Sequence, residues 1–292
     1  MPEGRARFEA WVAPARAAPQ LWRLIAGIGL AIVFWTAAFA LALLVPQARQ
    51  SEAGVLIAYL ASFAGMILGI AIAVRWLQRR PPRTLIGPDG LRPRAFAAGA
   101  LVAAVLGAIS LALSLGSEEV TRQADLAAWA ARVPLVLAAL LIQTSAEEIA
   151  FRGFLMQSLA ARFRSPLVWM LLPALLFGVS HLNGDAGIRN AWLMAGAATV
   201  IGLVLADVTV RTGSLSAAMG LHFANNAAAV LLLAPATPIL SGLALWVVDM
   251  DPAGGDAALG IAFDLGLAVA AWALWRLCRG RRRLHSQGAG SI

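Results

Sequence analysis

Apolar stretches recur along the entire chain, and most are close to the roughly 20 residues that a helix needs to cross a bilayer. Charged residues make up only 13% of the chain, against about 25% in a typical soluble domain. A soluble helical protein with a very apolar core would show shorter and more interrupted runs. We therefore predict an all-α polytopic membrane protein with about eight transmembrane helices. The candidate spans lie near residues 21–45, 54–75, 95–115, 130–152, 166–182, 190–210, 213–234 and 257–277.

The distribution of arginine predicts the topology. All 23 basic residues are arginines, and they cluster between the apolar runs. If the N-terminus faces the cytoplasm, 19 of them lie on the cytoplasmic side, and the exceptions are Arg49, Arg122, Arg132 and Arg189. Because positively charged loops stay inside, both termini are predicted to be cytoplasmic. The net charge of +8 is thus a topology signal, so the expected partner is the lipid bilayer and not a nucleic acid.

The chain divides into five predicted segments. The first, residues 1–20, is a cytoplasmic or interfacial segment, and the stretch 7–22 is either a short interfacial stretch with Trp11 and Trp22 at headgroup level or a disordered tail. Pro235–Asp251 carries about a dozen apolar residues after two prolines. It is predicted to re-enter the membrane, to lie along the interface or to extend the seventh span. The remaining segments are N-terminal helices (21–125), a core that holds most polar membrane residues (126–235), a re-entrant or interfacial segment with the last span (236–280) and a basic tail (281–292).

Charged residues inside the predicted spans indicate a functional site. The stretch SAEEIAFRGFLM, residues 145–156, places two glutamates and an arginine in an apolar run. Charges at membrane depth are costly, so they are rare there and tend to be functional. The candidates are Glu147, Glu148, Arg152, His181, His222, Asn225 and Asn226.

Counting from the turn between the fourth and fifth spans brings an acid and a histidine to equal depth. The turn centres near Arg164, and Glu147 and His181 each lie 17 residues from it. Counted from Arg162 and from Pro166 the separation is 15 residues each way, so in an antiparallel helical hairpin both lie roughly 22 Å along their helices and can face each other. His222 lies 11 residues beyond Arg211, which gives roughly 16 Å of depth on the seventh span. Tilt, a kink or a protruding inner turn must account for the difference.

Helical spacing separates the roles of the two glutamates. Glu147 and Glu148 are neighbours, so their side chains diverge by about 100°. Glu148 and Arg152 stand four residues apart with the acid first, the favourable order for an ion pair, which leaves Glu147 to face the cavity. His222 and Asn226 are also four residues apart, so they form one polar edge of the seventh span.

This set of side chains suits peptide hydrolysis. Burial disfavours the charged form of a glutamate and so makes its carboxylate a stronger proton acceptor. Glu147, aided by His181, could therefore take a proton from water. His222 and Asn226 could donate hydrogen bonds to the oxyanion of the tetrahedral intermediate. Alternatively, Glu147, His181 and His222 could hold a zinc ion that activates the water.

Each pattern also has an ordinary structural explanation. EExxxR occurs at solvated helix ends, FGVSH can place an interfacial histidine beside an aromatic ring, and HFANN can be polar packing between helices. Their joint occurrence on three predicted spans at comparable depth favours a functional site. Asn225 fits a packing role better, and Asp207 with Arg211 is predicted to be a structural pair.

The three motifs resemble those of the CPBP family, the CAAX-protease and bacteriocin-processing endopeptidases also called the Abi family. The family pattern of EExxxR, FxxxH and HxxxN or HxxxD reads here as EEIAFR (147–152), FGVSH (177–181) and HFANN (222–226), within about residues 130–235. The resemblance implies an eight-helix membrane endopeptidase whose site opens to the cytoplasm. It implies that Glu147 and His181 activate water, that His222 and Asn226 bind the oxyanion, and that Glu148, Arg152 and Phe177 support them. It leaves open a glutamic or a zinc-dependent metalloprotease mechanism.

The leading functional prediction is a hydrolase that cleaves a membrane-tethered or lipidated peptide or protein. The alternatives are a non-catalytic bacteriocin self-immunity factor or scaffold of the same fold, and a proton-coupled transporter that uses Glu147 and His181 as a relay. No inverted repeat of the kind found in transporters is visible. The Arg-rich and Ala-rich composition is consistent with a bacterial plasma membrane protein.

Overall fold

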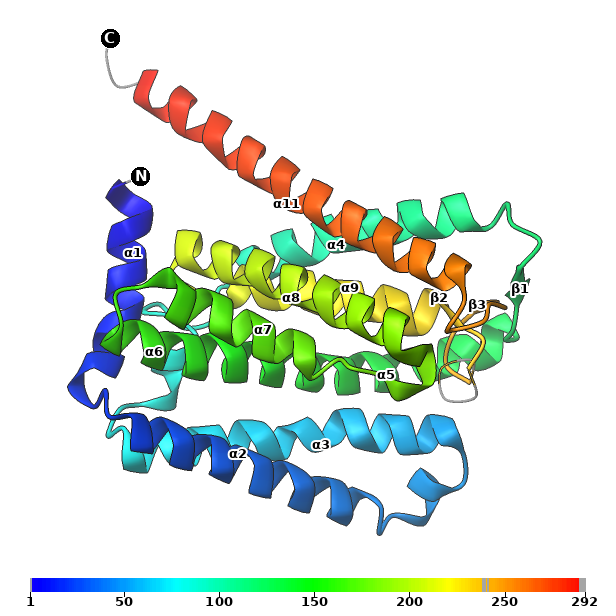
Figure 1. Ribbon diagram of the computed structural model, residues 1–292, viewed down its shortest axis with the longest axis horizontal. Coiled ribbons are helices and arrows are strands. Elements are labelled where there is room, and N and C mark those ends of the chain that lie inside the picture. Colours follow the sequence, from blue (N-terminus) through cyan, green and yellow to red (C-terminus); the bar gives the residue numbers. More distant parts are fainter. Residues whose placement is uncertain (1, 238–239, 241, 289–292) are drawn as a thin grey trace.

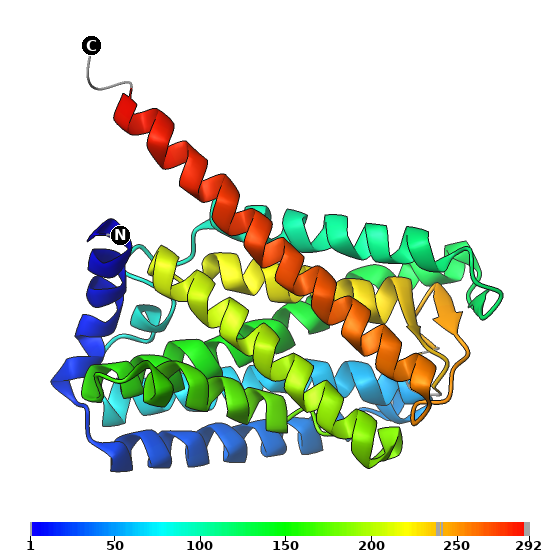
Figure 2. The same cartoon turned by 45° about the horizontal axis from the view of Figure 1, so that its top comes forward.

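The computed structural model describes residues 2–237, 240 and 242–288, and these form a bundle of helices (Figure 1). Successive long helices run in opposite directions, and α1 lies at the same end of the bundle as the last turns of α11. In Figure 2, α11 (orange to red) crosses the bundle obliquely, in contact with α4 and α8. The helices are α1 Pro2–Val12, α2 Leu21–Ala42, α3 Glu52–Ile72, α4 Pro93–Ser114, α5 Leu126–Glu147, α6 Gln157–Arg162, α7 Leu172–Val179, α8 Gly187–Thr212, α9 Ser216–Ala227 and α11 Gly255–Gly288.

The prediction of an all-α polytopic membrane protein is confirmed. Within the described residues, five helices are long and apolar enough to cross a membrane, and a shorter apolar helix covers Leu167–Val179. The five are Leu21–Ala42, Glu52–Leu77, Pro93–Ser114, Leu126–Arg162 and Gly184–Thr212. The count of eight spans and the cytoplasmic termini remain predictions. The predicted basic tail continues as α11 to Gly288, and residues 289–292 lie outside the described part.

The fourth predicted span is longer and less regular than expected. It is a continuous helix over Leu126–Arg162, and its middle, Glu148–Met156, is π-helical. Such π-helical turns are rare and occur frequently at functional sites. The carboxylate of Asp125 begins the helix, because its Oδ1 accepts hydrogen bonds from the backbone N–H groups of Ala127 and Ala128.

The depth of His222 is explained by a recessed start of α9. Leu215 and Ser216 are fully buried, since the loop that precedes α4 covers them. The Leu215 N–H donates to the Ile86 carbonyl at 2.8 Å, and the Arg92 N–H donates to Ser216 Oγ at 2.9 Å. The seventh span therefore begins inside the protein, so depth counted from Arg211 overstates the distance along the helix. From Ser216, His222 lies only about 9 Å along α9.

The N-terminal segment is helical over Pro2–Val12 and not a disordered tail, and the predicted headgroup position of Trp11 is wrong because this side chain is buried in the protein. Its indole is 1% exposed and donates to the Leu85 carbonyl at 3.0 Å. Phe8 stacks between Trp11 and Trp169, with ring centroids 5.8 and 5.0 Å away. The helix α1 thus packs onto the bundle because its aromatic side chains find protein partners. Trp22 is 57% exposed, and its position at headgroup level stays a prediction.

The opposite end of the bundle carries a small sheet that the sequence did not predict. The strands β1 Val120–Arg122, β2 Leu233–Pro235 and β3 Trp246–Val248 form the order β1-β3-β2, with β3 antiparallel to β1 and parallel to β2.

The segment Pro235–Asp251 is not helical throughout, because Trp246–Val248 form β3; residues 238, 239 and 241 lie outside the description, and the re-entrant or interfacial position stays a prediction. The indole of Trp129 donates to the Leu231 carbonyl and Arg132 donates to the Gly242 carbonyl. These bonds from α5 tie the segment across the end of the bundle.

Candidate active site

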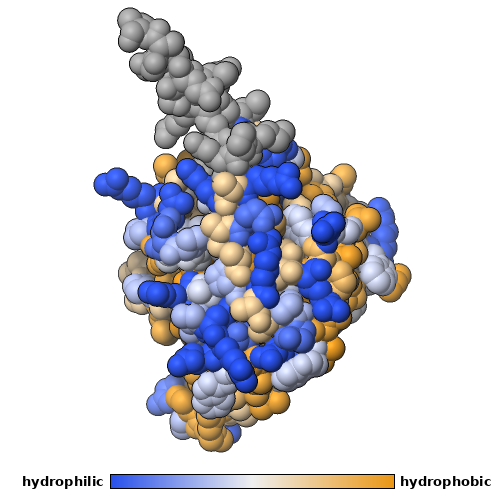
Figure 3. Space-filling view, turned by 90° about the vertical axis from the view of Figure 1, so that its left-hand side faces the viewer, coloured by the Kyte–Doolittle hydropathy of each residue, from blue (hydrophilic) through white to orange (hydrophobic). Residues whose placement is uncertain are grey.

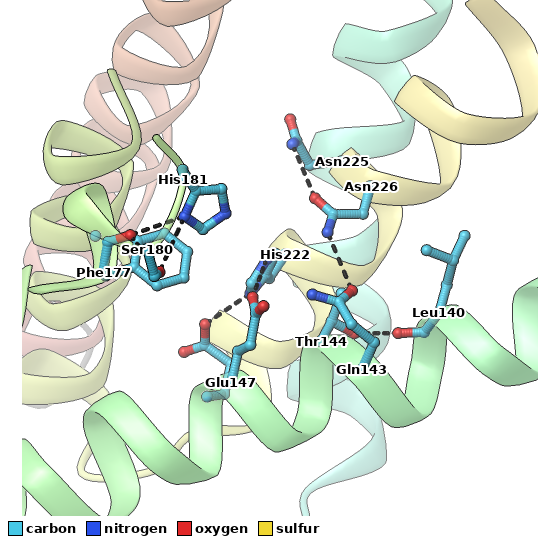
Figure 4. A network of polar contacts seen from close by, with 12 residues as sticks. Leu140, Gln143, Thr144, Glu147, Phe177, Ser180, His181, His222, Asn225 and Asn226 are labelled. Atoms are coloured by element: carbon cyan, nitrogen blue, oxygen red, sulfur yellow. Dashed lines mark hydrogen bonds and ion pairs between the residues drawn. The ribbon is translucent and has the colours of Figure 1, made fainter. Parts of the chain in front are cut away.

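The predicted site residues come from the end of α5 and the π-helical segment after it, from the C-terminal end of α7 and the turn beyond it, and from α9 (Figure 4). Glu147 is the last residue of α5 and Glu148 begins the π-helical segment. Glu147 is 9% exposed, and Glu148 and Arg152 are 0% and 2% exposed. The three charges of EExxxR are therefore inside the protein, so this motif does not mark a solvated helix end.

Glu148 holds two partners at once. Its Oε1 accepts a hydrogen bond from Arg152 Nη1 at 2.8 Å, which confirms the predicted ion pair. The same oxygen accepts from His222 Nδ1 at 2.8 Å. A carboxylate can only accept, so this contact assigns the Nδ1 proton of His222 and directs Nε2 toward the site. Glu148 thus orients a histidine in addition to pairing with Arg152.

Arg152 links the motif to two further helices. Its Nη2 donates to the Gly202 carbonyl of α8 at 3.3 Å. Its guanidinium also lies over the ring of Phe177 on α7, 4.6 Å from the centroid. The buried charge is therefore compensated by an acid, a carbonyl and a π face.

His222 stands between both glutamates. It is 5% exposed, and its Nε2 lies 3.5 Å from Glu147 Oε2. Two carboxylates thus meet one imidazole and one guanidinium in a closed environment. Oε2 of Glu147 and Oε2 of Glu148 are buried without a hydrogen-bond partner in the described part of the chain. Buried acceptors of this kind attract a donor such as a water proton.

His181 lies just beyond the end of α7, in a turn. Its Nδ1 lies 2.7 Å from the Phe177 carbonyl, which can only accept, so Nδ1 carries the proton and Nε2 can accept one. Phe177 packs against both imidazoles, with centroids 4.5 Å from His181 and 5.8 Å from His222. Figure 4 shows the ring of His181 on the same side of α5 as Glu147.

The predicted meeting of Glu147 and His181 around one water molecule stays a prediction. No hydrogen bond joins these two among the described residues, and Phe177 is the side chain that connects the histidines. The reason is that α7 ends at Val179. The depth count assumed a continuous helix up to His181.

The predicted polar edge of α9 reaches a residue that the sequence analysis missed. Asn226 Nδ2 donates to Gln143 Oε1 on α5 at 3.3 Å. Gln143 is 6% exposed and lies four residues before Glu147, hence on the same helix face. That spacing was the signal available in the sequence. Asn225 is exposed and donates only to Asn226 Oδ1, at 3.5 Å.

Gly178 allows α7 and α8 to approach closely beside the site. A Cβ at this position would collide with Thr199 Oγ1 and with the Ala195 carbonyl. The glycine in FGVSH therefore determines how near Phe177 and His181 come to the rest of the site.

The proposed zinc set of Glu147, His181 and His222 does not fit the arrangement. Among the residues described, no group of three His, Cys, Asp or Glu side chains is placed to hold a metal ion. Nδ1 of His222 is held by Glu148 and Nδ1 of His181 by the Phe177 carbonyl, so Nε2 is the ring nitrogen that each histidine keeps available. As they are arranged, these three side chains do not form the predicted zinc site.

Comparisons with known proteins match the same part of the chain. The family described as Type II CAAX prenyl endopeptidase Rce1-like matches residues 129–228, a range that includes every candidate residue of the site. The chain is also 31% identical over 217 residues to "Uncharacterized protein YyaK" of Bacillus subtilis (strain 168), across 70% of this chain and 71% of that protein. No solved structure matches the chain.

Proposed function

This chain belongs to the Rce1-like family of type II CAAX prenyl endopeptidases, and from that premise we propose that it is an intramembrane endopeptidase that uses a glutamate-activated water. The observation that carries the proposal is the buried group of Glu147, Glu148 and His222, in which one imidazole contacts both carboxylates. A purely structural ion pair needs one acid for Arg152. The second acid, with an unpartnered oxygen beside His222, supplies a base.

The proposed reaction assigns the base to Glu147. Glu147 takes a proton from water as the water oxygen attacks the scissile carbonyl carbon. Nε2 of His181 can accept a hydrogen bond from the same water, because its Nδ1 is held by the Phe177 carbonyl. The proton on Glu147 then passes to the nitrogen of the leaving amine as the C–N bond breaks.

The proposed oxyanion site lies on α9. Asn226 is oriented by Gln143, and its amide N–H groups can donate to the oxyanion. His222 presents Nε2 on the same edge of α9, and because Glu148 holds the proton on Nδ1, Nε2 donates to the oxyanion only in the doubly protonated imidazolium. Removal of one such donor commonly lowers kcat by about 10²–10³-fold, so both side chains are expected to matter for turnover and less for substrate binding.

The proposed substrate is a peptide tethered to the membrane by a span or a lipid. The site lies within the helical bundle and between apolar helices, which favours a substrate already in the bilayer. The proposed location is a bacterial plasma membrane, which the relative in Bacillus subtilis supports.

The test compares wild type with Glu147→Gln in liposomes that contain lipid-anchored, internally quenched peptides. Glu52→Gln is the matched control, because Glu52 is an exposed acid in the first turn of α3. We expect cleavage by wild type and the control and at least a hundredfold loss in Glu147→Gln. Equal cleavage by Glu147→Gln would end the assignment, and a wild type that cleaves none of the peptides would favour a self-immunity or scaffold role. Bound metal and the effect of a chelator are measured on the same samples.

A further inference from the structure

A cavity lies at the end of the bundle where α1, α6, α8 and α11 meet, far along the helices from the small sheet. Its volume is about 770 Å³, and five arginines line it: Arg5, Arg16, Arg164, Arg211 and Arg276. Figure 3 views this end and shows hydrophilic side chains gathered over it, with apolar surface on the flanks. We call it the inner-end cavity.

The inner-end cavity has more positive charge than its own acids can balance. Its two carboxylates belong to Glu9 and Asp207. Glu9 is paired with Arg16. Asp207 accepts two hydrogen bonds from Arg211 Nε, at 2.7 and 2.9 Å, and a third from the indole of Trp272. Both carboxylates are therefore occupied.

Three arginines remain for a ligand. Arg5 and Arg164 have no carboxylate within ion-pair distance among the described residues, and both are exposed. Arg276 lies over the ring of Trp272, 4.7 Å from the centroid, which leaves its N–H groups able to donate. A ligand with negative charge would satisfy all three.

The rest of the cavity wall is apolar and aromatic. Phe8 and Trp169 stack at 5.0 Å, and Phe163 and Val210 continue the wall. Arginine with tryptophan at the ends of membrane helices is typical of the headgroup region. Basic pockets between transmembrane helices on the cytoplasmic side bind anionic headgroups.

We propose that the inner-end cavity binds the phosphate of an anionic phospholipid. Arg5, Arg164 and Arg276 contact the phosphate oxygens, because the guanidinium fork matches a phosphate with paired hydrogen bonds. The glycerol and the first acyl carbons lie along the wall formed by Phe163 and Val210. A phospholipid and a soluble metabolite can both carry a phosphate ester. We assign the phosphate in this cavity to a phospholipid of the inner leaflet and not to a soluble metabolite.

The test measures lipid retention by native mass spectrometry on the full-length protein, with phosphatidylglycerol or phosphatidylcholine added in detergent. The variant Arg5→Gln/Arg164→Gln removes two charges from the cavity. Arg92→Gln/Arg94→Gln removes two exposed charges near the start of α4, outside the cavity. We expect one retained phosphatidylglycerol per chain, at least tenfold weaker binding in the cavity variant and less than a twofold change in the control.

A soluble competitor distinguishes the two sources of phosphate. Glycerol 3-phosphate at millimolar concentration should leave the lipid bound, since it lacks acyl chains. Displacement at that concentration would mean that the cavity binds phosphate, and it would contradict the proposal that the bound ligand is a lipid. Equal retention of the two lipids, or equal losses in the two double variants, would overturn the site itself. Circular dichroism checks that both variants are folded.

Discussion

Oε1 of Glu148 and Nδ1 of His222 lie 2.8 Å apart, although the two residues are separated by 74 positions in the chain. The contact joins the fourth span to α9 and selects one tautomer of the histidine. It also gives Glu148 a second task beside its pair with Arg152. The two motifs EExxxR and HxxxN therefore act as one unit in the structure.

Removing the cation of the buried ion pair should cost far more stability than removing the cation of an exposed pair of the same spacing, because it leaves an unpaired buried charge. Arg152→Met leaves Glu148 without its cation, at 0% exposure. Breaking a buried pair typically costs about 3–5 kcal/mol. Arg211→Met breaks a half-exposed i,i+4 pair with Asp207, for which about 0.3–0.5 kcal/mol is usual. Thermal unfolding in detergent should show a large drop in Tm for the first and a small one for the second; equal drops would contradict the assignment.

Gln143 should act as a positioning residue for Asn226. In Gln143→Ala, the amide of Asn226 loses its partner on α5. We expect kcat to fall by about tenfold and KM to change little. This loss is smaller than the roughly 10²–10³-fold fall in kcat that follows removal of an oxyanion donor itself. Asn225→Ala is the control, because its side chain is exposed and bonds only its neighbour. A rise in KM at constant kcat would instead indicate a role in substrate binding.

Gly178 should tolerate no side chain. In Gly178→Ala, the new Cβ meets the Ala195 carbonyl and Thr199, so α7 must move from α8 and carry His181 with it. Activity and Tm should both fall. Gly196→Ala on α8 is the matched control, because its Cβ would meet nothing within 4 Å. It should keep activity and gain a little stability, since alanine favours a helix by about 1 kcal/mol.

Trp11 should be essential for stability and Trp22 should not. Trp11→Ala removes a 1%-exposed indole and its bond to Leu85, a change that typically costs about 3–5 kcal/mol. Trp22 is 57% exposed, so Trp22→Ala should shift Tm only slightly. Limited proteolysis should then cut Trp11→Ala near the junction of α1 and α2, and wild type should resist it. Equal Tm values for the two variants would mean that α1 does not pack as described.

The class of the fold and the Glu148–Arg152 pair were predictable from the amino-acid pattern. The length of each apolar run predicts a membrane-spanning helix, because such a helix must match the thickness of the bilayer. The Glu148–Arg152 pair and the shared face of His222 and Asn226 were predictable because both follow from spacing along one helix. The identity of the site helices followed from the cost of placing charge in lipid.

The tertiary structure alone decided which side chains from different helices meet. The sequence placed Glu147 opposite His181, whereas the structure pairs His222 with Glu148 and leaves Phe177 between the histidines. Contacts between helices depend on their rotation and axial offset. Those are set by close packing at residues such as Gly178, by the recessed start of α9 and by the π-helical segment after Glu147. A one-dimensional pattern contains the period of each helix but not these offsets, so the pairing could be found only in three dimensions.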